Sequence, residues 1–149
     1  MGRVGTQVRV RGRAQEAEAL WYDTTRWPTF VDGFGRVASV DPEWPRAGTL
    51  TWDSTPGGRG RVLERVSRYA AGEGQEADVE DDRITARQRV RFRGDGDDVI
   101  VGLELDYRLK RSTPGFWLVD VLFIRRAQRD SLARTLRRFA IELSAESGL

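Results

Sequence analysis

The sequence predicts one α+β domain over residues 1–149, in which a curved antiparallel β-sheet of about seven strands wraps around a long C-terminal helix, with two short helices after the first strand. Three observations lead to this prediction. An alternating strand pattern opens the chain, strand patterns separated by turn residues fill its middle, and a helical period closes it. A sheet with one apolar face needs a cover, and only the terminal helix is long enough to provide one.

The N-terminal segment contains the first strand and the two short helices. Residues 4–12 alternate between apolar and polar faces, which predicts a half-buried strand. Apolar residues then recur at helical spacing in two sets, and Pro28 lies between them, where it suits a first helical turn but not a helix interior. We therefore expect two helices with a bend between them, the second ended by Gly33 and Gly35. The inward residues are Ala17, Leu20, Trp21 and Thr24 in the first set and Trp27, Phe30, Val31 and Phe34 in the second.

The middle of the chain consists of strands joined by turn residues. The clearest strand, residues 83–93, carries an arginine at every second position from Arg87 to Arg93, and its other face is largely apolar. Residues 98–110 alternate in the same way, so the two strands should form a hairpin with one apolar and one wet face. The predicted strands of this region are residues 36–41, 48–54, 60–70, 75–80, 83–93 and 98–110.

The helical period returns after residues 114–115 and continues to the end of the chain. Leucine and phenylalanine residues step by four, three and four positions from Leu132 to Leu143, with arginines on the opposite side. The pattern predicts a helix of roughly 25 residues, about 37 Å long. Residues 116–123 form either its first turns or a loop that leads into it.

The composition excludes several kinds of chemistry. The chain has no cysteine and no histidine, so any catalysis must use carboxylates, arginine, tyrosine or bound water. The acidic runs at 73–82 and 94–98 lack the glycine and glutamate of a calcium-binding EF-hand loop, and we expect neither a metal nor another cofactor. The 25 basic and 23 acidic residues are interleaved, which argues against a nucleic-acid partner. No apolar run reaches the roughly 20 residues of a membrane span, and we expect a cytoplasmic protein.

Three stretches, ALWYDTTRWPTFVDGFGRVASV, GRGRVLERVSRY and RRAQRDSLARTLRRFAIEL, resemble the START-like helix-grip superfamily (SRPBCC), and more narrowly its bacterial polyketide cyclase/dehydrase branch. The resemblance covers essentially the whole chain. It implies a hydrophobic cavity between the sheet and the long helix that holds a small apolar or aromatic molecule. It also implies that a cyclase of this family holds a poly-ketone as its enolate through polar groups, commonly an arginine. Arg59, in a turn, and Arg61, whose facing the pattern leaves open, are nearest to that position.

Three functions therefore remain as hypotheses. The first is binding of a small hydrophobic or aromatic ligand, which can be polyketide-, lipid- or isoprenoid-like. The second is a metal-independent polyketide cyclase or dehydratase of the aromatase type, which stabilises an enolate and transfers protons. The third is a structural or interaction domain with a filled core. A homodimer is a partner state that the sequence leaves open.

Three polar residues are candidates for the site, and they are also the candidate catalytic residues if the protein is an enzyme. Gln88 interrupts an apolar strand face, so its amide either binds a ligand or bonds a neighbour or water. Glu64 is either an inward carboxyl with a raised pKa or, as Leu63 and Tyr69 favour, an outer solvated one. Tyr107 faces inward and brings its hydroxyl either to the cavity or to water at the sheet edge. The predicted cavity lining is Trp21, Trp27, Phe30, Phe34, Trp52, Gln88, Phe92, Leu103, Leu105, Tyr107 and Phe123.

Overall fold

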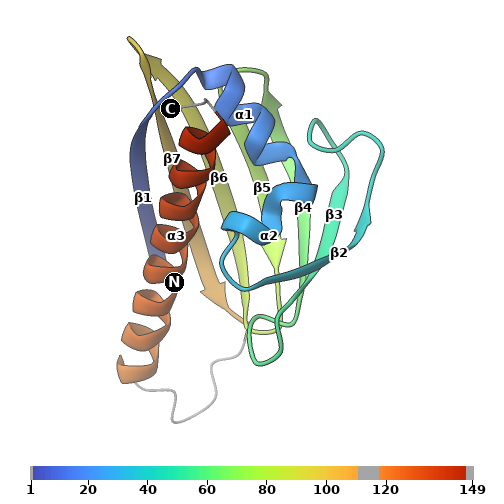
Figure 1. Cartoon of the computed structure of the whole chain (residues 1–149). Helices are drawn as coiled ribbons and strands as arrows, with labels where there is room; N and C mark the ends of the chain where they lie inside the picture. The colour runs from blue at the N-terminus through green and yellow to red at the C-terminus, as the bar shows by residue number, and fades with distance from the viewer. Residues whose placement is uncertain (1, 111–117, 147–149) are drawn as a thin grey trace.

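The computed structural model describes residues 2–110 and 118–146 (Figure 1). The elements follow the predicted order, and a turn of 3-10 helix, η1, joins the two short helices. The elements are β1 (Gly2–Arg11), α1 (Ala14–Tyr22), η1 (Thr24–Arg26), α2 (Trp27–Phe30), β2 (Phe34–Val40), β3 (Thr49–Ser54), β4 (Arg61–Ala70), β5 (Gly74–Glu80), β6 (Ile84–Asp95), β7 (Asp98–Leu109) and α3 (Leu118–Glu146).

All seven strands form one antiparallel sheet in the order β1-β7-β6-β5-β4-β3-β2. Strands β2 to β7 are hydrogen-bonded to their neighbours in sequence, whereas β1 lies at the far edge beside β7. The short helices α1 and α2 connect the two edges on the same side of the sheet as α3 (Figure 1). The predicted fold class, a curved antiparallel sheet covered by a long terminal helix, is therefore confirmed. We call the face toward the helices the inner face and the opposite face the outer face.

The terminal helix α3 has 29 residues and is therefore about 43 Å long. It begins at Leu118, so the stretch 116–123 is helical from that residue onward, while residues 114–117 lie outside the described part of the chain. Its backbone lies closest to β1 and α2 and approaches β7 much less closely. The long helix therefore covers one side of the inner face more closely than the other.

The two short helices meet at a bend, as Pro28 predicts. Helix α1 ends at Tyr22, and Asp23 then starts the 3-10 turn by accepting a 3.1 Å hydrogen bond from the Thr25 N–H. Pro28 lies in the first turn of α2. Phe34 is a correction to the predicted second helix. Gly33, with φ of 73°, turns the chain, and Phe34 is the first residue of β2.

The aromatic residues of this segment pack into the core in two groups. Trp21 and Phe30 contact Phe139 of α3, with ring centroids 5.5 and 5.2 Å away respectively, and so join the short helices to the long one. Trp27 and Phe34 contact Trp52 of β3 at 6.4 and 5.4 Å. These side chains therefore close the inner face at the α1 and α2 end of the molecule.

Candidate functional site

The middle of the inner face carries short side chains between two polar ones. Hydrogen-bond register places Glu64 of β4 opposite Val79 of β5, Val79 opposite Ala86 of β6, and Ala86 opposite Tyr107 of β7. These four residues form one row across β4 to β7, with the Glu64 carboxyl group at one end, the Tyr107 phenol at the other and two small apolar side chains between them. In the next row, Gln88 lies between an alanine and a leucine.

Two inward-facing side chains at the centre of this arrangement are not fully buried. Ala86 and Gln88 point inward, as the buried residues Ile84 and Val90 on the same strand do, yet both are only half-buried. Strand β6 lies inside the sheet, not at its edge, and the backbone of α3 lies mainly over β1 and α2. An inward side chain in the middle of a sheet is accessible only where the covering layer leaves space. We call the part of the inner face around these two half-buried side chains the accessible region over β6.

Glu64 lies inside the molecule with only 5% of its surface exposed, so the preference for a solvated outer position was wrong. Its Oε2 accepts a 2.8 Å hydrogen bond from the indole Nε1–H of Trp52. Burial raises the pKa of Glu64, while the Trp52 hydrogen bond and the Arg59 charge act in the opposite direction. Glu64 is thus a carboxyl group that holds its proton to a higher pH than a solvated glutamate does.

A β-bulge explains why the strand pattern around Glu64 was ambiguous. The register of β4 against β5 shifts between Val66 and Arg68. One extra residue exchanges the two faces of a strand. Before the shift, the even-numbered residues of β4 face inward, as Glu64 does. After the shift, the odd-numbered Tyr69 faces inward, and its ring centroid lies 5.7 Å from that of Tyr22.

Arg59 reaches back from the β3–β4 turn to the same end of the inner face. Its guanidinium carbon lies 5.5 Å from the centre of the Trp52 ring, and its Nε donates a 2.7 Å hydrogen bond to Asp81. Asp81 is buried, and its second oxygen accepts hydrogen bonds from the backbone N–H groups of Arg83 and Ile84. One guanidinium nitrogen of Arg59, Nη2, is buried and has no hydrogen-bond partner within the described residues.

The remaining predicted lining residues lie on the inner side of the molecule with one exception. Tyr107 is 3% exposed and lies against Gly2, where a Cβ would come within 2.5 Å of the phenol oxygen. The residues Trp21, Trp27, Phe30, Trp52, Phe92, Leu103 and Leu105 are also buried in the core. Phe34 is partly buried and packs against the core. Whether any of them contacts a ligand stays a prediction.

Phe123 and Arg61 are corrections. Phe123 is 69% exposed, so it does not line the inner face, because α3 turns this position toward solvent. Arg61 faces outward and donates a 2.8 Å hydrogen bond to Asp53. The arginine near the candidate site is therefore Arg59.

Asp81 and the reach of Arg59 are the parts of the site that the sequence did not reveal. In the sequence, Asp81 falls within the acidic run at 73–82. An aspartate directly before a turn commonly accepts backbone N–H groups, and this was the available signal. Within residues 2–110 and 118–146, no group of three or more carboxylates lies close enough together to hold a metal ion. None of the described helices is long and apolar enough to span a membrane.

The architecture and site geometry together define the class of fold. A seven-stranded antiparallel sheet, two short helices after the first strand and a long C-terminal helix constitute the START-like helix-grip fold, and this chain has it.

Several solved structures share this fold. A START superfamily protein from Mycobacterium smegmatis is 15% identical, with a TM-score of 0.76 over 96% of this chain and 97% of its own. A protein from Thermus thermophilus is also 15% identical, with a TM-score of 0.80 over 98% of this chain and 99% of its own. The di-domain ARO/CYC from the steffimycin biosynthetic pathway is 15% identical, with a TM-score of 0.75 over 99% of this chain and 52% of its own. No protein-family model and no curated protein matches the chain.

Proposed function

We propose that this protein binds a small hydrophobic or aromatic molecule between the inner face of the sheet and α3. The observation that carries the proposal is the accessibility of Ala86 and Gln88, which point inward from β6. A filled core would bury both side chains. The walls of this region are apolar and aromatic, which suits a polyketide-, lipid- or isoprenoid-like ligand.

The polar groups around this region favour a ligand that carries oxygen. The side chain of Gln88 makes no hydrogen bond within the described residues, so its amide is free to bond a carbonyl or hydroxyl group. Arg59 offers a buried N–H donor without a described partner. Glu64 is a further acceptor or, when protonated, a donor. Such a ligand would have an apolar body and a few oxygen atoms.

A metal-independent cyclase or dehydratase is the second candidate, and Glu64 with Arg59 favours it. A carboxyl group with a raised pKa can give and take a proton near neutral pH. A guanidinium group nearby can stabilise an enolate oxygen, and the electrostatic effect of Arg59 on Glu64 indicates that the two are close. The fold is also shared by a di-domain ARO/CYC. In this scheme Glu64 moves the proton and Arg59 holds the oxygen.

A structural or interaction domain with a filled core is the third candidate. It requires the space over β6 to be closed. Binding of an apolar probe therefore separates it from the first two candidates.

The binding proposal can be tested with the neutral fluorescent probe N-phenyl-1-naphthylamine and with native mass spectrometry of the purified protein. Ala86→Phe places a ring in the accessible region and should abolish probe binding and remove any co-purifying small molecule. Thr85→Phe is the matched control, because its side chain lies next to Ala86 on the same strand but faces the opposite way. Equal probe binding by wild type and Ala86→Phe, or none by wild type, would show that the ligand site is not here.

The enzymatic alternative needs a separate measurement. A linear poly-ketone thioester is incubated with wild type, Glu64→Gln and Arg59→Gln, and ring formation is followed. Turnover should fall by at least about 100-fold in Glu64→Gln, the size expected for a lost general acid or base, while probe binding is retained. Turnover that is unchanged in both variants rejects the assigned chemistry and leaves the binding proposal intact.

A further inference from the structure

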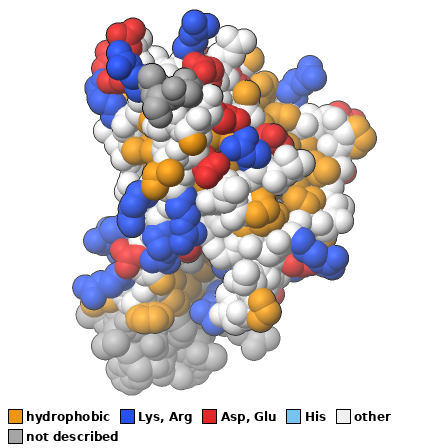
Figure 2. All heavy atoms as spheres, in the orientation of Figure 1, with side chains coloured by type: hydrophobic (Ala, Val, Ile, Leu, Met, Phe, Trp, Pro, Cys, Tyr) orange, Lys and Arg blue, Asp and Glu red, His pale blue; other side chains and the backbone are white. Residues whose placement is uncertain are grey.

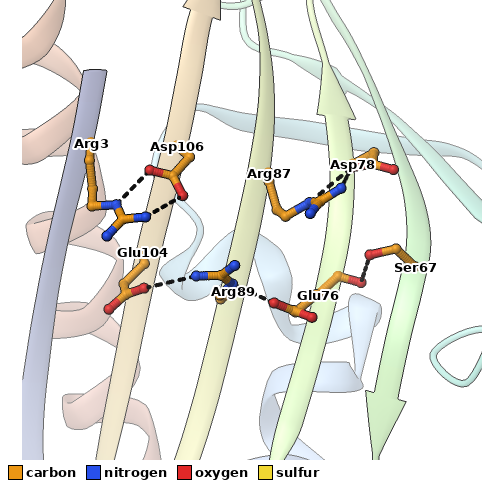
Figure 3. Close-up of polar contacts among 8 residues, drawn as sticks. All are labelled: Arg3, Ser67, Glu76, Asp78, Arg87, Arg89, Glu104 and Asp106. Atoms are coloured by element: carbon orange, nitrogen blue, oxygen red, sulfur yellow. Dashed lines mark hydrogen bonds and ion pairs between the residues drawn. The ribbon is translucent and has the colours of Figure 1, made fainter. Parts of the chain in front are cut away.

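The outer face of the sheet carries a regular pattern of opposite charges. One row across the strands reads Arg3, Asp106, Arg87, Asp78 and Arg65 in order from β1 to β4. The next row reads Gly5, Glu104, Arg89, Glu76 and Arg68. In Figure 3 the guanidinium of Arg89 lies between the carboxylates of Glu76 and Glu104, and Arg87 lies beside Asp78. These rows are close to charge balance.

The pattern stops at Arg91. Its neighbours across the strands are Gly102 on β7 and Gly74 on β5, where the preceding rows have carboxylates. Arg91 and Arg93 are both exposed, and neither forms an ion pair within residues 2–110 and 118–146. Arg91 and Arg93 therefore lack carboxylate partners of the kind that pair with Arg87 and Arg89 on the same strand.

A recess of about 520 Å³ lies beside these arginines, between β1, β7 and β6. It is lined by Gly5, Thr6, Gln7, Arg89, Arg91, Arg93, Ile100, Gly102, Leu103 and Glu104. Glu104 is the one acidic side chain of this lining, and it already faces Arg89. The recess therefore presents net positive charge.

Gly102 forms part of the recess, and the backbone conformation there does not require a glycine. A Cβ at this position would meet no atom within 4 Å, and its φ is not in the left-handed region. Gly74 differs, because a Cβ there would come within 2.0 Å of the Val90 carbonyl oxygen. A glycine inside a strand weakens it and commonly marks a place where another backbone approaches closely. At Gly102 the space beside the backbone is open, and packing within the described residues does not require a glycine.

We propose that this recess docks an extended acidic segment of a partner protein, with carboxylates at alternate residues that pair with Arg91 and Arg93. Residues two apart on a strand are separated by about 6.7 Å, and an extended partner segment has the same repeat on one of its faces. Arginine forms paired hydrogen bonds with carboxylates, which adds geometry to the charge attraction. The side-chain-free position at Gly102 leaves room for the segment's backbone.

A nucleic acid fits this face less well. Its phosphates need a continuous basic track, whereas carboxylates are interleaved with arginines over most of the outer face. A neighbouring recess of about 490 Å³ illustrates this, because Asp78, Glu80 and Asp106 lie among its arginines. Arg65 and Arg68 also form no ion pair within the described residues, but the register places them opposite Asp78 and Glu76. Arg91 and Arg93 have no carboxylate opposite them on the neighbouring strands, which suits a short acidic segment.

The proposal can be tested with two synthetic peptides of identical composition and ¹⁵N-labelled protein. One peptide alternates three glutamates with serines, and the other has the three glutamates adjacent. The alternating peptide should bind at least about three-fold more tightly and shift the amide signals of Gln7, Arg91 and Gly102. Binding should weaken as the salt concentration rises.

Three variants make the test specific. Arg91→Ala and Gly102→Thr should each weaken binding of the alternating peptide by about five-fold, the first by removing a cation and the second by filling the recess. Arg87→Ala removes the same charge from the same strand and face outside the recess, so it should change affinity by less than about two-fold. Thermal unfolding of each variant shows whether its fold is retained, and Arg93→Ala replaces any variant that does not fold.

Several outcomes overturn the proposal. Equal affinity for the two peptides would show that the spacing of the carboxylates does not matter. Unchanged binding by Gly102→Thr would show that the peptide does not bind in the recess. Shifts concentrated on the basic side chains along α3, which are visible in Figure 2, would place the anion site elsewhere. Tighter binding of single-stranded oligothymidylate than of the alternating peptide in the same recess would indicate a nucleic acid. Each of these results is independent of ligand binding at the inner face.

Discussion

The Nε1–H of Trp52 donates a 2.8 Å hydrogen bond to Oε2 of Glu64 inside the protein. The two residues lie on adjacent strands, where Glu64 is opposite Leu50, two residues before Trp52, and both are buried. Burying a carboxyl group costs free energy unless it is hydrogen-bonded. This contact therefore makes it possible for Glu64 to lie at the inner face, close to the accessible region over β6.

Trp52→Phe keeps most of the aromatic packing but removes the donor to Glu64. The free energy of unfolding should fall by about 1–3 kcal/mol, because the carboxyl group loses its described hydrogen bond while staying buried. Urea denaturation at neutral pH measures the change. The control is the same substitution in a Glu64→Leu background, where the loss should be clearly smaller. An equal loss in both backgrounds would assign the effect to packing alone.

Glu64 should make the stability of the protein depend on pH. In the unfolded chain Glu64 ionises near its ordinary pKa of 4.5, whereas burial raises the pKa in the folded state. The folded protein therefore holds this proton where the unfolded chain has lost it, and stability is lost as the pH rises from 4.5 through the folded-state pKa.

Urea denaturation of wild type and Glu64→Gln between about pH 4 and pH 8 measures this effect. Wild type should lose stability relative to Glu64→Gln as the pH rises. Carboxyl groups with lowered pKa values, such as Asp53 and Asp106, are present in both proteins, and their contributions cancel in the difference. A difference that stays constant over this range would contradict the raised pKa.

Asp32 should stabilise the attachment of α3 to the short helices. Its carboxylate accepts hydrogen bonds from Ser131 and Arg134 of α3 at 2.8 and 3.0 Å. Burial acts to raise the pKa of Asp32, but the hydrogen bonds from Arg134 and Ser131 outweigh it and the pKa is lowered. Asp32→Asn should reduce the free energy of unfolding by about 1–2 kcal/mol at neutral pH.

The effect of Asp32→Asn should depend on pH in the direction opposite to that of Glu64. A group with a lowered folded-state pKa stabilises the protein above its ordinary pKa, 3.8 for Asp32, and loses this contribution as the pH falls through the folded-state value. The difference between wild type and Asp32→Asn should therefore shrink at acidic pH. Ser144→Ala, on the same helix away from this contact, should have little effect at any pH. A loss that persists unchanged in acid would mean that the charge of Asp32 is not responsible.

Two phenylalanines of α3 should differ strongly in their contribution to stability. Phe139 is fully buried and contacts both Trp21 and Phe30, so Phe139→Ala should cost about 3–5 kcal/mol. Phe123 is exposed, and Phe123→Ala should change stability by less than about 0.5 kcal/mol. Thermal denaturation compares them directly. A large loss in Phe123→Ala would show that this ring is buried in solution.

Gln88→Leu should be close to neutral for stability. The Gln88 amide is half-buried and makes no hydrogen bond within the described residues, so its replacement by an apolar side chain of similar size breaks none of the hydrogen bonds described. The free energy of unfolding should stay within about 0.5 kcal/mol of wild type. Gln75→Leu is the contrasting variant, because the Gln75 amide donates a 2.8 Å hydrogen bond to the Pro45 carbonyl and its loss should be destabilising. A similar loss in both variants would indicate that Gln88 has a structural role.

The facing of residues along regular strands could be read from the sequence, and departures from regularity could not. Gln88 and Tyr107 lie on the predicted face because alternation along β6 and β7 is uninterrupted where they stand. Glu64 was misplaced because the β-bulge in β4 gives the two ends of that strand opposite parity. Phe123 was misplaced because it falls near the start of α3, where the sequence did not show whether the chain was helix or loop.

The sequence by itself determined the order of the elements, the fold class and the two faces of most strands. These follow from local periodicity, since a period of two or of 3.6 residues must place apolar side chains on one side of a strand or a helix. Only the tertiary structure decided which polar groups meet. Arg59, Trp52 and Asp81 come from a turn, a strand and a second turn, and their contacts depend on how the sheet curves and where β4 is bulged. The same holds for the outer face, where the unpaired state of Arg91 and Arg93 depends on the register that places Gly102 opposite Arg91 and Ile100 opposite Arg93.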